Sequence, residues 1–361
     1  MARLLVTRRR ALSVLGGSAA TALAAQGSIA TILAVSQRAP RPAAPAFPRG
    51  AVIRTLLADL PPESLGGGPV LFHEHLSMKY PPQAQTHFTD DVAMMVDEVR
   101  AAGKEGIACI VDGGHPDMSR SLDALKRIAM ESGVPIVASG GFYMQRTYPS
   151  DIATRSVDQI ADDLARDAVT QRLGAFGEIG QQGGVPTDDE KKVFQAVAKA
   201  QVRTGLPIFT HNEYTGTRPA SPPIPMDAAL RQLDVLEGAG ALPARVAIGH
   251  VCCLDDPKAV VAQQLAKRGV FVGFDRVTIP IVTDAERVAM IMAMVEAGYA
   301  DRVLISSDFA VAGSLKKNGG AGLAQASTVF GPMLLKAGMP EPVLHGIMVD
   351  NPRRFLAFVP R

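Results

Sequence analysis

Short apolar segments alternate with longer amphipathic segments from about Val52 to the end of the chain. The short segments have the continuous apolar character of strands buried on both faces, and the longer ones have the periodicity of surface helices. Predicted strands cover residues 70–73, 107–112, 135–139, 174–178, 207–211, 245–250, 270–274 and 303–308. Predicted helices cover residues 90–102, 121–132, 157–173, 188–204, 226–238, 257–268, 284–298 and 322–338.

Eight strand–helix units in about 310 residues predict a (β/α)8 barrel, in which parallel strands form a closed core inside a ring of helices. The competing architecture is a doubly wound open sheet. That fold usually carries a glycine-rich nucleotide loop after its first strand, and the sequence has neither a GxGxxG nor a P-loop motif. We therefore expect one barrel over residues 51–361, with its active site at the C-terminal ends of the strands.

Polar side chains recur at those predicted strand ends. Two histidines one residue apart close the first strand, and residues i and i+2 of a strand face the same side, so both imidazoles can reach one point. Taken singly, a histidine or carboxylate at a strand end is readily explained by a core hydrogen bond, a buried ion pair or a helix N-cap. Six of them on five strand ends predict a metal site. These residues are His73, His75, Glu178, His211, His250 and Asp308.

The type and order of these residues resemble the amidohydrolase superfamily, and the details resemble its phosphotriesterase branch. The motifs that carry the resemblance are FHEHL at 72–76, IGH at 248–250, SSD at 306–308 and VDNPRRFL at 349–356, with IRT at 53–55. The resemblance implies two divalent ions. His73, His75 and Asp308 would bind the more buried ion, and His211 and His250 the more exposed one. Glu178 would bridge them, as in the subset of the family that has glutamate in place of a carbamylated lysine.

The resemblance also implies the chemistry. Two divalent ions that share a water lower its pKa toward neutrality, and Asp308 is expected to take the proton of that water during attack. Zinc is the usual metal of the family, although histidine and carboxylate ligands also accept manganese, cobalt or iron. We expect hydrolysis of small ester-like bonds, with lactones first. Phosphotriesterase activity is the alternative, and a non-catalytic metal-binding barrel is a third, against which the intact Asp308 argues.

Candidate substrate contacts follow two other strands. Phe142 and Tyr143 come after the third strand and would line the pocket, although simple packing explains them equally well. Asp275 and Arg276 come after the seventh strand and resemble the Asp-Arg pair of the phosphotriesterase-like lactonases. We expect this pair near the mouth of the barrel, facing a polar part of the substrate.

The first 35 residues differ from the rest. Arg8, Arg9 and Arg10 precede an uncharged run rich in Ala, Gly and Ser, which is typical of a twin-arginine export signal; a Sec signal or a membrane helix remains an alternative. Residues 36–50 are rich in Pro and Ala and are predicted to form a linker. We therefore expect contact with the export machinery and a periplasmic or extracellular location, or tethering to the membrane by an uncleaved signal.

The overall composition limits the partners. The formal net charge is +2, and no basic stripe suggests nucleic-acid binding. Three cysteines, an odd number, do not form a disulfide framework. The expected partner is a small-molecule substrate, and the sequence leaves the oligomeric state open, a homodimer included.

Overall fold

The structure is a computed structural model that describes residues 45–80, 84, 86–212, 225–254, 256–279 and 282–361. The signal predicted for residues 1–35 and most of the linker predicted for residues 36–50 lie outside the described residues. Within the described ranges, no helix is both long enough and apolar enough to span a membrane.

Eight strands form one sheet whose spatial order follows the chain, and every neighbouring pair is parallel. The first and last strands of this order also meet. Just after the last strand, the backbone N–H of Asp308 donates to the carbonyl of His73 in the first strand at 3.2 Å. The predicted (β/α)8 barrel is thus confirmed. The strands are β3 (Val70–Glu74), β4 (Cys109–Asp112), β5 (Ile136–Gly140), β6 (Ala175–Gln181), β7 (Ile208–Asn212), β8 (Val246–Ile248), β9 (Phe271–Phe274) and β10 (Val303–Ile305).

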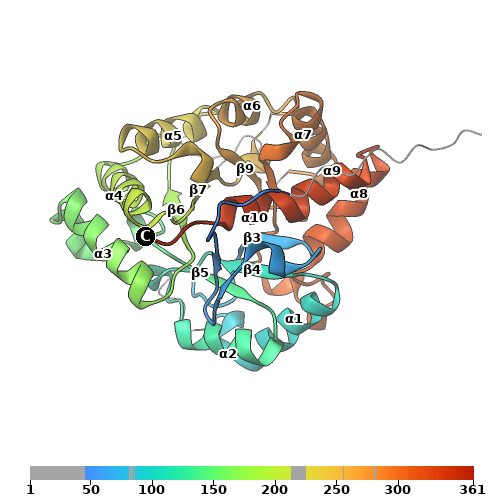
Figure 1. Cartoon of the computed structure of the whole chain (residues 1–361), viewed down its shortest axis with the longest axis horizontal. Coiled ribbons are helices and arrows are strands. Elements are labelled where there is room, and N and C mark those ends of the chain that lie inside the picture. Colours follow the sequence, from blue (N-terminus) through green and yellow to red (C-terminus); the bar gives the residue numbers. More distant parts are fainter. Residues whose placement is uncertain (1–44, 81–83, 85, 213–224, 255, 280–281) are drawn as a thin grey trace, which may run out of the picture. The chain divides into compact units, whose positions relative to one another are not determined.

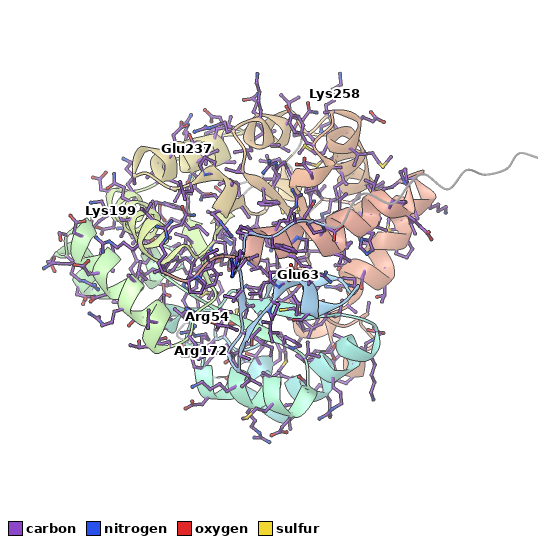
Figure 2. All side chains as sticks on the ribbon, in the orientation of Figure 1. Arg54, Glu63, Arg172, Lys199, Glu237 and Lys258 are labelled. Atoms are coloured by element: carbon purple, nitrogen blue, oxygen red, sulfur yellow. The ribbon has the colours of Figure 1, made fainter. Side chains whose placement is uncertain are left out.

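Helices surround the strands (Figure 1). Ser156, Thr187 and Thr283 each accept a hydrogen bond from the third backbone N–H of the helix that follows, which explains where those helices begin. Charged side chains such as Lys199 and Glu237 point outward from this ring (Figure 2). The helices are α1 (Val92–Lys104), α2 (Leu122–Ser132), α3 (Val157–Thr170), α4 (Asp188–Thr204), α5 (Ala228–Gly238), α6 (Val260–Lys267), α7 (Asp284–Glu296), α8 (Gly331–Lys336), α9 (Glu341–His345) and α10 (Asn351–Leu356).

Most predicted strands and helices differ from the structure by a few residues at their ends. The strands predicted for 245–250 and 303–308 end at Ile248 and Ile305, because His250 (φ 59°) and Asp308 (φ 49°) adopt left-handed backbone conformations that cannot continue a strand. The helix predicted for 322–338 begins with a π-helical turn over Ala326–Phe330 and becomes α-helical only in α8.

An apolar plug fills the barrel at the end opposite the predicted site. Residues near the starts of the strands cluster with Ile53 of the hairpin β1 (Ile53–Arg54)–β2 (Asp59–Leu60) and with Phe355 of α10. The rings of Phe72 and Phe355 meet edge to face with centroids 6.3 Å apart. The polar side chains at the carboxyl ends of the strands therefore lie at the other end of the barrel, away from this plug.

Candidate metal centre

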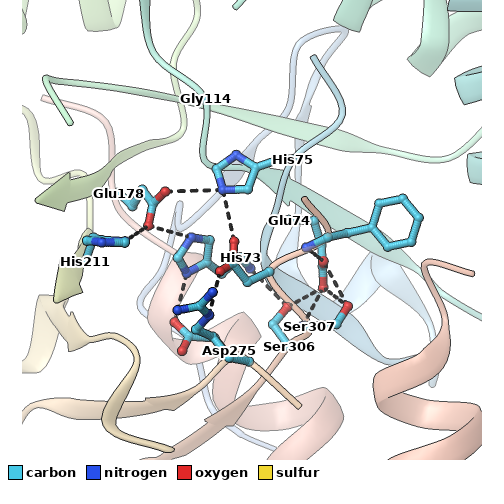
Figure 3. A network of polar contacts seen from close by, with 12 residues as sticks. His73, Glu74, His75, Gly114, Glu178, His211, Asp275, Ser306 and Ser307 are labelled. Atoms are coloured by element: carbon cyan, nitrogen blue, oxygen red, sulfur yellow. Dashed lines mark hydrogen bonds and ion pairs between the residues drawn. The ribbon is translucent and has the colours of Figure 1, made fainter. Parts of the chain in front are cut away.

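The six predicted ligands converge at the C-terminal ends of the strands. Figure 3 shows four of them, His73, His75, Glu178 and His211. His75 Nε2 lies 3.2 Å from Glu178 Oε1 and 3.1 Å from Asp308 Oδ1. His73 Nε2 lies 3.1 Å from Glu178 Oε2. These residues come from β3, β6 and the segment after β10, and we refer to the group as the β3–β10 position.

A second group shares the same glutamate. His211 Nδ1 lies 2.8 Å from Glu178 Oε2 and 2.9 Å from His250 Nε2, while His250 Nε2 is 3.6 Å from Glu178 Oε2. We refer to this group, from β6, β7 and the end of β8, as the β7–β8 position. Glu178 therefore directs one oxygen toward His75 and the other toward the remaining histidines, as a bridging carboxylate would.

Two glycines make room for the cluster. A Cβ on Gly113, directly after β4, would lie 3.2 Å from Cδ2 of His73 and 3.3 Å from Cε1 of His75. Gly177 precedes Glu178 with φ 152°, and a Cβ there would come within 2.3 Å of the Phe209 ring. Any larger residue at either position would displace a candidate ligand or its backbone.

Asp275 lies behind the histidines and not at the mouth. Its two oxygens lie 2.8 Å from His73 Nδ1 and 3.0 Å from His250 Nδ1, and its side chain is fully buried. Because an ionised carboxylate only accepts hydrogen bonds, each Nδ1 carries the proton and each Nε2 presents a lone pair to the cluster. The substrate contact predicted for Asp275 does not fit this placement. The carboxylate instead orients one histidine of each position.

Arg276 and Tyr143, two of the predicted substrate contacts, lie beside the cluster. Arg276 Nε lies 3.1 Å from Asp308 Oδ2, and its side chain keeps 24% of its surface exposed. The Tyr143 hydroxyl lies 3.2 Å from His211 Nε2 and 3.3 Å from Nδ1. Phe142 instead packs its half-buried ring edge to face against Tyr148, with centroids 6.1 Å apart, which favours the packing interpretation.

The electrostatics of the two positions differ. Burial lowers the pKa of His75, but hydrogen bonds with Asp308 and Glu178 outweigh it and raise that pKa to about 10. The pKa of His73 is likewise raised well above its usual range, since Glu178 and Asp275 overcome the effect of burial. Burial keeps the pKa of His211 below its usual value despite Glu178. At the β3–β10 position Glu178 and Asp308 both lie within 3.2 Å of His75 Nε2, and these anions favour a cation there.

The donor set fits divalent metal ions. Imidazole nitrogens and carboxylate oxygens are ligands for zinc, manganese, cobalt and iron alike. With its proton on Nδ1, His73 Nε2 turns a buried lone pair toward the Glu178 carboxylate 3.1 Å away, an arrangement that is costly unless a cation lies between them. The β3–β10 position offers four ligand residues and the β7–β8 position three, with Glu178 common to both.

Sequence reasoning missed one buried carboxylate beside the site. Glu74 stands between the two histidines of the first strand and is fully buried, and burial raises its pKa to about 7 despite hydrogen bonds from Ser306, Ser307 and Phe309. The sequence signal that could have revealed it is a glutamate within an apolar strand. Such a residue is buried, so its carboxylate must accept hydrogen bonds from nearby donors.

Comparisons with known proteins agree with this geometry. Residues 53–356 match the phosphotriesterase family. The chain is 26% identical to an N-acetyltaurine hydrolase of Xenopus tropicalis over 357 residues, which cover 85% of this chain and 98% of that protein.

Two solved structures are also similar. A phosphotriesterase homology protein from Escherichia coli, complexed with phosphate in its active site, is 28% identical with a TM-score of 0.72, covering 80% of this chain and 99% of that one. A resiniferatoxin-binding protein from Rhodobacter sphaeroides is 30% identical with a TM-score of 0.73, covering 85% and 95%.

Proposed function

We propose a function that starts from the family: this chain belongs to the phosphotriesterase family, as its motifs suggested. It is a metal-dependent hydrolase of that family. Our proposal is that it hydrolyses bonds at a carbonyl carbon, with lactones as the first substrate class. The observation that carries it is the position of Asp308, between His75 at 3.1 Å and the partly exposed Arg276 at 3.1 Å.

Asp308 is placed to act as the base. Burial raises its pKa, but His75 and Arg276 outweigh that effect and hold the pKa of Asp308 well below its usual range, so the carboxylate is ionised at neutral pH. Two divalent ions bound by the six ligands would supply an acidified water and polarise the carbonyl oxygen of the substrate. The Asp308 carboxylate takes the proton from that water and passes it to the leaving group.

The side chains beside the cluster favour a planar carbonyl over a phosphotriester. Tyr143 and Arg276 bring a hydroxyl and a guanidinium within 3.3 Å of His211 and Asp308 respectively. A lactone presents one face of a planar carbonyl and a polar ring oxygen, which these groups can contact. A phosphotriester needs space for three substituents around a tetrahedral centre, which is poorly matched to polar side chains at that distance.

A second class deserves the same test, because curated relatives that cover 85% of this chain are described as N-acetyltaurine hydrolases. The bond in N-acetyltaurine is an amide, and its leaving amine carries a sulfonate. Arg276, a partly exposed cation beside Asp308, would suit such an anion. N-acyl amines with an anionic end are therefore the second candidate substrates.

The experiment is a panel of lactones, anionic N-acyl amines, aryl esters and phosphotriesters, assayed with zinc-loaded full-length protein. We expect kcat/KM for the best carbonyl substrate to exceed that for the best phosphotriester by at least about 100-fold, or roughly 2.7 kcal/mol of transition-state binding. Asp308→Asn should abolish the difference. Equal or reversed values would assign phosphotriesterase activity, and an inactive, metal-loaded protein would favour the non-catalytic barrel.

We also propose that the protein is exported through the twin-arginine route, since Arg8, Arg9 and Arg10 precede an uncharged, small-residue run. Replacing all three with Lys keeps the charge but removes the guanidinium groups that a receptor reads. Cell fractionation should then find the folded protein retained in the cytoplasm. Unchanged export of this variant would point to the Sec route or to a membrane anchor.

A further inference from the structure

Glu74 points away from the candidate ligands on either side of it. Its carboxylate lies against Ser306 and Ser307 after β10, on the opposite side from Glu178 (Figure 3). The side chain is fully buried, and its contacts among the described residues are all with hydroxyl and backbone N–H donors. A carboxylate so placed can bind no metal at the cluster, so its contribution must act through the segment that it holds.

That segment is held on both sides of Asp308. Glu74 Oε1 accepts hydrogen bonds from the Ser306 hydroxyl at 2.7 Å and from the Ser307 N–H at 2.9 Å. Glu74 Oε2 accepts one from the Phe309 N–H at 2.8 Å. The Ser307 hydroxyl lies 3.0 and 2.9 Å from the two oxygens.

The backbone of Asp308 needs such support. Its φ of 49° is in the left-handed region, which is unfavourable for a residue with a side chain and persists only when the surroundings enforce it. Its own N–H donates to the carbonyl of His73 at 3.2 Å. The N–H groups of residues 307, 308 and 309 thus all donate to two consecutive residues of β3, and two of those three bonds end on Glu74.

We propose that Glu74 is a positioning residue for Asp308, and that it sets the metal affinity of the β3–β10 position by fixing the backbone conformation that aims the Asp308 carboxylate. The inference rests on the role of Asp308 in the proposed function. It adds a reason for a glutamate between the two histidines: the same short strand provides two ligands directly and holds the third through its side chain.

The chain contains a matched control. Glu98 of α1 is also buried, and its two oxygens accept hydrogen bonds from the backbone N–H groups of Lys316 at 3.2 Å and Leu323 at 3.3 Å. It therefore fixes another part of the chain after β10 by the same kind of contact, but its bonds do not reach the cluster. If any loosening of the chain after β10 weakens Zn²⁺ binding, Glu98→Gln will weaken it too. If the effect acts through Asp308, Glu98→Gln will leave Zn²⁺ affinity nearly unchanged.

The test uses Zn²⁺ and full-length protein, with affinity and stoichiometry measured by competition with a chelating dye. Glu74→Gln keeps the size of the side chain, but its amide NH₂ must face N–H or O–H donors at one end. We expect roughly 10–100-fold weaker binding of one Zn²⁺, the range typical of losing a partner that orients a ligand. Glu98→Gln should change Zn²⁺ affinity less than about twofold, since its donors do not touch the ligands.

A double-mutant cycle with Asp308→Asn separates positioning from a merely structural role. If Glu74 acts through Asp308, then Glu74→Gln adds less than about threefold to the loss already caused by Asp308→Asn. Full additivity of the two losses, or an equal loss in Glu98→Gln, would overturn the proposal. The measurement of Zn²⁺ affinity needs no substrate. It therefore tests the role of Glu74 even if every hydrolysis assay fails and the proposed function is wrong.

Should Glu74→Gln fail to fold, Ser307→Ala provides a milder test, because it removes one hydroxyl donor and leaves both backbone N–H bonds to Glu74 in place. We expect a roughly 2–10-fold loss of Zn²⁺ affinity, the effect of one hydrogen bond. An unchanged affinity in a folded Ser307→Ala protein would count against the proposal.

Discussion

The two metal positions share Glu178 but are built differently. The β3–β10 position is tied together by the backbone, since Asp308 donates to the carbonyl of His73 and the carboxylate of Glu74 holds the residues around it. The β7–β8 position is held mainly by side chains: Gln232 donates to the carbonyl of His211, Asp275 accepts the N–H of His250, and the Tyr143 hydroxyl lies 3.2 Å from His211 Nε2.

Electrostatics increase this difference. The pKa of His75 is raised to about 10 by Asp308 and Glu178 although burial opposes it, whereas burial lowers the pKa of His211. The first position offers four ligand residues and the second three, and Asp308 lies 3.1 Å from His75 but 3.7 Å from His250 Nε2. The comparison teaches that one shared bridging ligand does not make two equal sites, and we expect the β3–β10 position to bind its cation more tightly.

The largest expected effect comes from removing one ligand at each position. His211→Ala should leave one tightly bound Zn²⁺ per chain, because the four ligand residues of the β3–β10 position remain intact. His75→Ala should weaken that tight ion by more than roughly 100-fold, beyond the loss of an orienting partner alone. Elemental analysis after dialysis against a weak chelator measures both. The reverse pattern, with His75→Ala retaining the tighter ion, would reverse our assignment of the stronger position.

Asp275→Asn should affect both positions at once. An asparagine has one accepting oxygen, so either His73 or His250 faces an NH₂ group and loses its orientation. We expect Zn²⁺ affinity to fall roughly 10–100-fold at both positions. Glu190→Gln is the control, since this buried glutamate accepts the N–H of Thr187 at the start of α4. Loss of a single ion in Asp275→Asn would show that the carboxylate serves one position only.

The smallest effect is expected from Tyr143→Phe. This change removes only the hydroxyl near His211, and a metal bound at Nδ1 would leave Nε2 as the partner of that hydroxyl. Affinity at the β7–β8 position should fall roughly 2–10-fold, with the other position unchanged. Titration of the apoprotein with Zn²⁺ measures the affinities of the two positions separately. An equal loss at both positions would mean that Tyr143 acts through the shared Glu178.

The sequence predicted the barrel and brought six ligand candidates together because both depend on short-range patterns. Alternating apolar segments specify the strands, and the carboxyl ends of parallel strands meet at one edge. The role of Asp275 could not be read in this way, because it depends on which side of the turn after β9 its carboxylate takes. The left-handed conformations of His250 and Asp308 are likewise set by tertiary contacts and not by residue type.

The apolar plug has a consequence for how the protein is made. Val52 and Phe358 exchange two backbone hydrogen bonds, of 2.8 and 3.0 Å, so the segments that precede and follow the eight barrel strands pair with each other. Phe355 follows all eight strands in the chain, so Phe72 can pack against Phe209 before its contact with Phe355 forms. Closing a contact between residues so distant in sequence is slow because the entropy of the intervening chain opposes it. The apolar end of the barrel is therefore completed only when residues 355–357 join the strands that precede them in the chain.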